Sequence, residues 1–224
     1  MIIERLLERL ARLDACAISD ALDTLGLPGA TTGVGRLWSV SRVVVGRART
    51  IQATPRDDRR SSDHIAARAI DGASDADVLV VANDGRTDVS CFGGILTRAA
   101  VRRGVRGVLI DGACRDIDES EKFDFPVFGR AVVPVSARGR IVQLSMDRTV
   151  RFAEVNVDSG DLVIADSNGI VFIPVQHADD VIRMAELISA REDRMAAAVD
   201  SGTAVADVMH DSKFPAREDL DNER

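Results

Sequence analysis

Apolar residues recur at helical spacing near both ends of the chain, and they form short continuous runs in between. Near the N-terminus, five of them make one stripe on a charged segment: Ile3, Leu6, Leu7, Leu10 and Leu13. This spacing predicts an amphipathic helix. Asp14 is suited to cap a second helix, which Gly26 would end. Towards the other end of the chain, the pattern predicts a long helix from about residue 177 to residue 199.

Two strand–helix units are predicted in the middle of the chain. The apolar run 78–82 is followed by a helix over 95–103, and the run 108–110 is followed by a short helix after Asp116. Continuous apolar strands that alternate with helices favour a sheet that is buried on both faces. We therefore expect an α/β fold.

Further elements are predicted on either side of these units. Residues 43–52 read as strands around Gly46, and residues 61–63 offer caps for a helix that carries Ile65 and Ile70. Short strands separated by Gly, Asp and Asn turns follow at 125–128, 131–135, 141–144, 152–157, 162–165 and 170–173. Residues 167–169, Ser-Asn-Gly, favour a tight turn between the last two strands.

The composition favours one folded domain and argues against several classes of partner. The chain has 224 residues, 46% of them hydrophobic, and we expect a single domain over residues 1–209 with a charged, mobile tail over 210–224. A net charge of −7 and the absence of Tyr argue against binding to nucleic acid or to anionic membranes. No apolar run approaches the roughly 20 residues that span a bilayer, and the N-terminal segment is unlike a signal peptide. We expect a cytoplasmic protein.

The few cysteines and histidines are scattered along the chain. Cys16, Cys91 and Cys114 form no C-x-x-C pair, and they read as reduced thiols rather than as disulfides or zinc ligands. Cys91 and Cys114 flank the segment discussed next, where packing is a better explanation for them than a nucleophilic role. With only three histidines, a metal would be a hard ion held by carboxylates and water, Mg²⁺ or Mn²⁺ first.

Chemistry-bearing residues gather between residues 90 and 120. Gly93 and Gly94 open a predicted helix, followed by Ile95 and Leu96. Glycines at such a junction let the backbone approach a ligand, and the free N–H groups of a helix N-terminus bind carboxylate or phosphate. Taken alone, the two glycines are explained equally well by a turn that serves packing.

Arg115 and Asp116 follow a buried strand that ends in Asp111-Gly112. Arginine offers a planar fork for a carboxylate, and an adjacent aspartate can hold a hard metal within reach of the same ligand. Adjacent Arg-Asp pairs are common on solvated surfaces. The position of this pair favours a site, because ligands of α/β sheets collect at the carboxyl ends of strands.

The segment from Gly93 to Asp116 reads G-G-x-L and then A-x-x-x-G-V-x-G-x-x-I-D-G-x-x-R-D. Together with Ile18-Ser19-Asp20-Ala21-Leu22 and with the run from Gly160 to Asp166, it resembles the RraA-like family over roughly residues 15–200. This resemblance implies a swivelling β/β/α-type single domain with N- and C-terminal helices. It also implies a homotrimer or a hexamer made of two trimers, with sites at the subunit boundaries.

The resemblance further implies a divalent-metal-dependent lyase that cleaves a small 2-oxo dicarboxylate to pyruvate. Enzymes of the family act as 4-hydroxy-4-methyl-2-oxoglutarate aldolase and as oxaloacetate decarboxylase. The backbone amides of Gly93, Gly94, Ile95 and Leu96 would bind the substrate. The side chain of Arg115 would hold its oxygens, and Asp116 would anchor Mg²⁺ partly through water. The metal and Arg115 would then polarise the 2-oxo group while the C3–C4 bond breaks.

One position departs from the pattern of the known aldolases. An acidic residue that serves in proton transfer often stands where this chain has Gly94. A general base must then come from elsewhere in this chain or from the C-terminal helix of a neighbouring subunit: Asp84, Asp88, Asp111, Glu186 or Glu192. Because decarboxylation needs no such base, Gly94 favours decarboxylation or a different 2-oxo acid.

The same family contains a non-enzymatic regulator that binds an RNA-processing endonuclease, and this is the alternative function. The regulator lacks the acid of the R-D pair, whereas this chain retains Asp116. A basic cluster at Arg98, Arg102, Arg103 and Arg106 could attract RNA, but the acidic net charge favours a solvated helix face.

Overall fold

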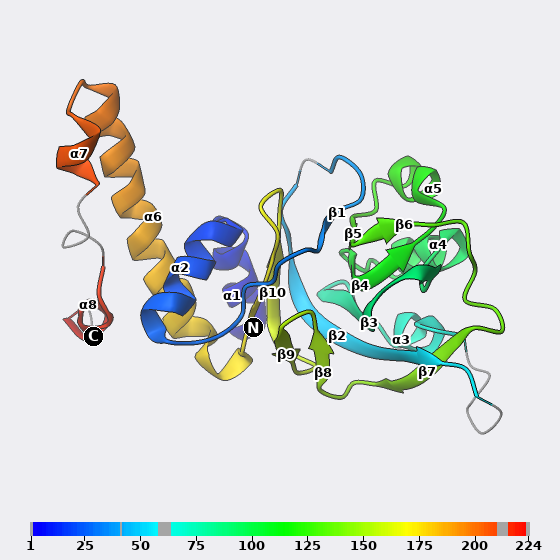
Figure 1. The fold of residues 1–224 in the computed structure, drawn as a ribbon. Helices are drawn as coiled ribbons and strands as arrows, with labels where there is room; N and C mark the ends of the chain where they lie inside the picture. The colour runs from blue at the N-terminus through cyan, green and yellow to red at the C-terminus, as the bar shows by residue number, and fades with distance from the viewer. Residues whose placement is uncertain (1, 41, 58–63, 210–214, 223–224) are drawn as a thin grey trace.

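Four parallel strands form the centre of the fold in the computed structural model, which describes residues 2–40, 42–57, 64–209 and 215–222. They are β2 (Val44–Pro55), β3 (Asp77–Ser90), β4 (Val108–Cys114) and β5 (Val127–Gly129). The main path of the sheet runs in the order β1-β5-β4-β3-β2-β10-β11 (Figure 1). The expected α/β fold with N- and C-terminal helices is confirmed.

Antiparallel strands extend this sheet on both sides. β10 (Leu162–Ala165) and β11 (Ile170–Ile173) continue it beyond β2, and β1 (Gly35–Arg36) closes the other edge. β7 (Ile141–Met146) pairs antiparallel with the second half of β2, whereas β6 (Ala131–Val132) pairs in parallel with β4. β8 (Val150–Phe152) and β9 (Val155–Val157) form a separate hairpin.

Helices cover the sheet in two groups that lie at opposite ends of the molecule (Figure 1). α3 (Ala67–Asp71), α4 (Gly94–Arg102) and α5 (Ile117–Lys122) lie beside β3 and β4. At the other end, α1 (Ile2–Leu10) and α2 (Ala15–Leu25) pack with the long helix α6 (Ala178–Asp200). The short helices α7 (Val205–Val208) and α8 (Arg217–Asn222) follow, after a 3-10 turn at Val175–His177 has led into α6.

The alternation of side chains along β3 shows that the sheet is buried on both faces, as predicted. Leu79 and Val81 belong to the cluster under α3, α4 and α5, whereas Val78 and Val80 belong to the cluster on the opposite face. All four are 0% exposed. The β8–β9 hairpin covers that opposite face, where Phe152 packs edge-on against another ring.

Several local predictions are confirmed. Asp14 caps α2 by accepting a hydrogen bond from the Ala17 N–H at 2.8 Å, and Gly26 ends the helix with a left-handed φ of 69°. The long helix predicted over 177–199 is α6. The tight turn at 167–169 joins β10 to β11, with the N–H of Asp166 bonded to the carbonyl of Gly169 at 3.0 Å.

Other elements differ from the sequence pattern. The predicted strand over 152–157 is broken at Ala153, whose φ of 50° turns the chain into the β8–β9 hairpin. α3 begins only at Ala67, because Ala66 has a left-handed φ of 66°. The caps predicted at 61–63 lie outside the described residues.

The ends of the chain contribute to the helical group. In α8, Leu220 is buried in the cluster formed by α1, α2 and α6, and Arg183 donates a hydrogen bond to its carbonyl at 3.3 Å. The division into a domain over 1–209 and a tail over 210–224 stays a prediction. Among the described residues, no helix is long and apolar enough to cross a membrane.

Candidate functional site

The N-terminus of α4 meets the end of β4, and this junction places Arg115 and Asp116 beside Gly93 and Gly94. The backbone N–H of Arg115 bonds to the carbonyl of Phe92 at 3.0 Å, which fixes the two segments side by side. Asp116 follows with a left-handed φ of 57° and turns the chain into α5. Its Oδ2 accepts a hydrogen bond from the Gly94 N–H at 2.9 Å.

Glycine at position 93 makes this close approach possible. A Cβ there would lie 2.7 Å from Asp116 Oδ2 and 3.2 Å from Arg115 Nε, which is too close for either atom to stay in place. The same two atoms are 3.4 Å apart and form an ion pair. The two explanations of the glycines, a turn that serves packing and a binding site, are thus compatible, because the space that the glycines leave is filled by charged side chains.

The first turn of α4 has backbone donors to spare. Gly93 provides no side-chain cap, and Asp116 takes only the N–H of Gly94. Among the described residues, the backbone N–H groups of Ile95 and Leu96 have no hydrogen-bond partner. Leu96 packs inward, whereas the Ile95 side chain is 80% exposed beside these donors. Such a helix N-terminus can bind a carboxylate.

Sequence reasoning missed Glu119, which lies at the same junction. Its carboxylate occupies the space beside Gly94, and its Oε1 pairs with Arg98 Nε. The signal was present in the spacing, because Glu119 stands three residues after Asp116 and the short helix α5 carries both past the same turn of α4. This spacing alone does not identify Glu119, because nothing in the sequence shows that α5 packs on α4.

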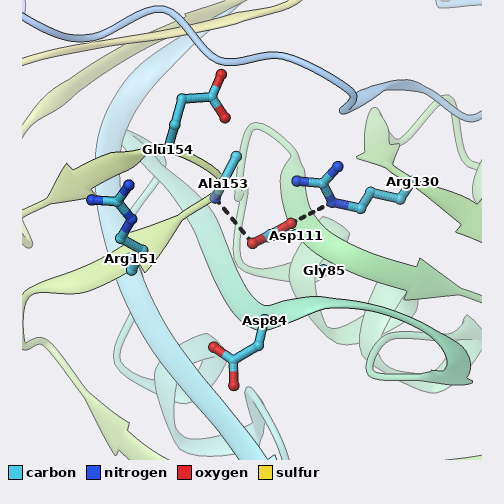
Figure 2. A pocket seen from close by; sticks show the side chains of 7 residues that line it. All are labelled: Asp84, Gly85, Asp111, Arg130, Arg151, Ala153 and Glu154. Atoms are coloured by element: carbon cyan, nitrogen blue, oxygen red, sulfur yellow. Dashed lines mark hydrogen bonds and ion pairs between the residues drawn. The ribbon is translucent and has the colours of Figure 1, made fainter.

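The candidate base Asp111 does not belong to this junction. Its Oδ1 accepts from Arg130 Nε at 2.5 Å and its Oδ2 from the Ala153 N–H at 2.9 Å, as Figure 2 shows. Leu109, two residues earlier on β4, packs on the face covered by the β8–β9 hairpin, away from α4. Both carboxylate oxygens are therefore engaged, and Oδ2 attaches that hairpin to the sheet. Asp84 lines the same region and carries a φ of 52°.

The other candidate bases are also occupied or distant. Asp88 accepts two hydrogen bonds from Arg86, at 3.0 and 2.7 Å. This pairing is the main reason that the pKa of Asp88 lies below its usual value. Glu186 makes two hydrogen bonds to Arg9 within the helical group. Burial, followed by repulsion from Asp14 and Asp20, raises the pKa of Glu192, also on α6. Within one copy, α6 lies at the opposite end of the molecule from α4 (Figure 1).

Two cavities of about 420 Å³ each lie elsewhere on the described surface. One is the region of Asp84, Asp111 and Arg130 in Figure 2, where Arg151 and Glu154 complete the wall. The other lies between α3 and α4. The side chains of Arg115 and Asp116 are instead 41% and 45% exposed, so a single copy presents the junction as an open surface.

The two cysteines near the junction are unsuited to nucleophilic chemistry. Both are buried, and burial is the main cause that raises the pKa of Cys114 to about 12 and that of Cys91 further still. The thiol of Cys91 donates to the carbonyl of Ala113 at 3.5 Å. Because the thiolate is the reactive form, the packing role expected for these residues agrees with their surroundings.

The described residues contain no group of three or more His, Cys, Asp or Glu side chains placed to hold a metal. A cation at the junction would therefore take few protein ligands and keep much of its water, which is the habit of Mg²⁺. Asp116 offers Oδ1, which has no partner among the described residues.

Comparison with solved structures finds the same fold. An uncharacterized protein from Pseudomonas syringae pv. tomato superimposes with a TM-score of 0.83 at 29% identity, over 92% of this chain and 98% of that one. Streptomyces coelicolor RraAS2, described as an unusual member of the RNase ES inhibitor RraA protein family, gives a TM-score of 0.80 at 26% identity, over 86% and 97% of the two chains.

Comparison of sequences gives one relative that is much longer than this chain and one of similar length. Protein DlpA of Legionella pneumophila is 30% identical over 206 residues, which are 92% of this chain but only 33% of DlpA. A protein of Halalkalibacterium halodurans named "Putative 4-hydroxy-4-methyl-2-oxoglutarate aldolase" is 31% identical over 170 residues, 75% of this chain and 76% of that protein. A family model described as RraA-like, Aldolase/RraA, matches residues 15–172. The chain therefore belongs to the RraA-like family.

Proposed function

We propose that this protein is a Mg²⁺- or Mn²⁺-dependent carbon–carbon lyase that releases pyruvate from a small 2-oxo dicarboxylate. The observation that carries the proposal is the junction of α4 and β4, where Arg115, the Asp116 carboxylate and unpaired helix amides lie together. The aldolase name of the Halalkalibacterium relative supports the same reaction class. 4-Hydroxy-4-methyl-2-oxoglutarate and oxaloacetate are the two substrates to test.

The residues at the junction fit a hydrated divalent ion. Asp116 is held through Oδ2 by the Gly94 N–H, which leaves Oδ1 as an oxygen ligand of fixed position. The absence of side chains at Gly93 and Gly94 lets the carboxylates of Asp116 and Glu119 approach the helix N-terminus. When bound, such an ion supplies Lewis-acid polarisation of the 2-oxo group.

The chain's own residues would bind and orient the substrate. The N–H groups of Ile95 and Leu96 would bind its C1 carboxylate at the positive end of α4. The Arg115 guanidinium would hold the 2-oxo oxygen and stabilise the negative charge that develops there when the C3–C4 bond breaks. These donors are in place before the substrate arrives, so little reorganisation opposes the reaction.

We further propose that the site is completed by a second copy of the chain in a homotrimer, with a hexamer as the alternative. The open surface at Arg115 and Asp116 and the 80% exposed Ile95 beside it support this arrangement. A neighbouring α6 would bring Glu186 and Glu192 to a junction that they cannot reach within one copy.

Pyruvate release tests the proposal. Purified protein is incubated with oxaloacetate and with 4-hydroxy-4-methyl-2-oxoglutarate, with added Mg²⁺ or Mn²⁺ and with EDTA, and pyruvate is followed by a coupled lactate dehydrogenase assay. We expect release that EDTA abolishes and added metal restores. Release at the uncatalysed rate from both substrates would contradict the lyase assignment.

The second candidate is a non-enzymatic regulator that binds an RNA-processing endonuclease. The resemblance in fold to Streptomyces coelicolor RraAS2 supports it. Asp116 argues against it, because this acid is what a binding protein of the family does without. Inhibition of an RNase E-type endonuclease by this protein, without any pyruvate release, would favour the regulator.

A further inference from the structure

The carboxylate of Glu119 lies where a side chain at position 94 would be. A Cβ on Gly94 would collide with Glu119 Oε2, and it would lie 2.8 Å from Glu119 Cδ and 3.5 Å from Asp116 Cβ. The missing side chain at Gly94 is therefore what lets a carboxylate from α5 reach the first turn of α4. As a result, two acidic side chains approach the same helix N-terminus.

Contacts between α4 and α5 hold Glu119 in this place. Its Oε1 pairs with Arg98 Nε, and the Arg98 guanidinium also lies 4.9 Å from the centre of the Phe123 ring. A buried hydrogen bond of 3.1 Å between the hydroxyls of Thr97 and Ser120 fastens the two helices. Arg98 thus holds Glu119 through Oε1, whereas Oε2 has no partner among the described residues.

An ion pair alone does not account for this placement. A pair at a partly exposed surface contributes little to stability and needs only one carboxylate oxygen. Arg98 engages that one oxygen, whereas the other is pressed against Gly94 next to Asp116. The arrangement leaves Oε2 free to accept a hydrogen bond from a water molecule at the junction.

We propose that Glu119 is a positioning residue for the divalent ion that Asp116 would bind, and that it orients water in the hydration shell of that ion. This inference rests on the proposed function. Mg²⁺ and Mn²⁺ sites anchored by one carboxylate keep several waters, which need acceptors around them. Removing an acceptor outside the ligands themselves commonly costs 10- to 100-fold in metal affinity.

Isothermal titration calorimetry of Mn²⁺ binding to the purified protein tests this role without any substrate. We expect Glu119→Gln to weaken Mn²⁺ binding by roughly 10-fold or more. Glu121→Gln, the same change at an exposed position of α5, is the matched control and should bind as the wild type does. Melting curves without metal check that both variants are folded.

A double variant moves the carboxylate instead of removing it. Gly94→Asp combined with Glu119→Ala places an acid on α4 itself, one turn before Arg98, so the charge returns to the same space. We expect this variant to recover Mn²⁺ affinity to within roughly threefold of the wild type, whereas Glu119→Ala alone stays weak. Recovery would not occur if Glu119 served only to join α5 to α4.

The outcomes separate this inference from the function on which it rests. If Asp116→Asn abolishes Mn²⁺ binding while Glu119→Gln binds like the wild type, the metal site stands and the role of Glu119 is wrong. If the wild-type protein binds no Mn²⁺ and releases no pyruvate, the proposed function is wrong, and the role of Glu119 is overturned with it.

Discussion

Asp116 Oδ2 accepts a hydrogen bond from the backbone N–H of Gly94 at 2.9 Å, although 22 residues separate the two in the chain. The carboxylate thus does for α4 what an N-cap side chain does for an ordinary helix, since Gly93 at the N-cap has no side chain to offer. Asp116 therefore has two separable roles: one oxygen stabilises the helix, and the other is available to a cation.

Substitution of Asp116 should separate these roles. Asp116→Asn keeps an oxygen that can accept from Gly94 and a residue type that tolerates the left-handed backbone, so we expect a free energy of unfolding within about 0.5 kcal/mol of the wild type. Asp116→Ala loses the cap and should cost about 1 kcal/mol or more. Both variants should lose metal-dependent pyruvate release. Urea unfolding and the coupled assay measure the two effects, and equal stability of the two variants would contradict the capping role.

Arg115 should act on the substrate and not on the fold. Its side chain is 41% exposed and its Nε pairs with Asp116 over 3.4 Å, so its contribution to stability is small. Arg115→Ala should lower kcat/KM roughly 10- to 100-fold, with part of the loss in kcat, because both the bound 2-oxo oxygen and the charge that develops on it lose their partner. Arg115→Lys retains the charge without the planar fork and should recover only part of this loss. Unchanged steady-state kinetics in the alanine variant would contradict the assignment.

Asp111 should matter for stability instead. Its side chain is only 5% exposed, and it pairs with Arg130 while accepting from the Ala153 N–H. Asp111→Asn cannot satisfy both partners with one oxygen, and we expect the free energy of unfolding to fall by about 2–4 kcal/mol. The same substitution at the exposed neighbour, Asp84→Asn, is the control and should change it by less than about 0.5 kcal/mol. Similar denaturation midpoints for the two variants would refute the structural role.

The thiol of Cys114 should resist alkylation in the native protein. Burial raises its pKa to about 12 from an ordinary value near 9. The reactive thiolate is therefore roughly 0.01% of the folded molecules at pH 8. Mass spectrometry after iodoacetamide treatment at pH 8 should find Cys114 unmodified in the folded state and modified in urea. The sign for stability follows: the folded state retains this proton above pH 9, so stability should fall as the pH rises beyond that value. Rapid modification without denaturant would contradict the burial.

Much of the fold follows from local sequence signals. Asp14 and Gly26 set the ends of α2 because capping is decided by the cap residue and its immediate neighbours. The apolar runs around Val80 and Leu109 identified the buried parallel strands, because a strand covered on both faces has apolar residues at successive positions. The left-handed turn at Ala153 could not be predicted, because alanine disfavours that conformation and the hydrogen bond from its N–H to Asp111 is a tertiary contact.

The site was predictable only in part. The G-G and R-D motifs predicted which residues would meet, and the structure brings Gly94 and Asp116 together, although their functional roles stay predictions. Two features depended on tertiary packing that no motif encodes. Glu119 reaches Gly94 only because α5 lies on α4, and Asp111 turns away because strand residues alternate between faces.

The left-handed backbone at Asp116 has an evolutionary consequence. Asn tolerates this conformation as Asp does and keeps an oxygen that can accept from Gly94, so the position can exchange its acid for a neutral residue without disturbing the chain path. A single substitution at this position can thus remove the carboxylate and leave the backbone conformation unchanged. A lineage could lose the carboxylate there, keep every strand in register, and be selected afterwards for what its surface recognises.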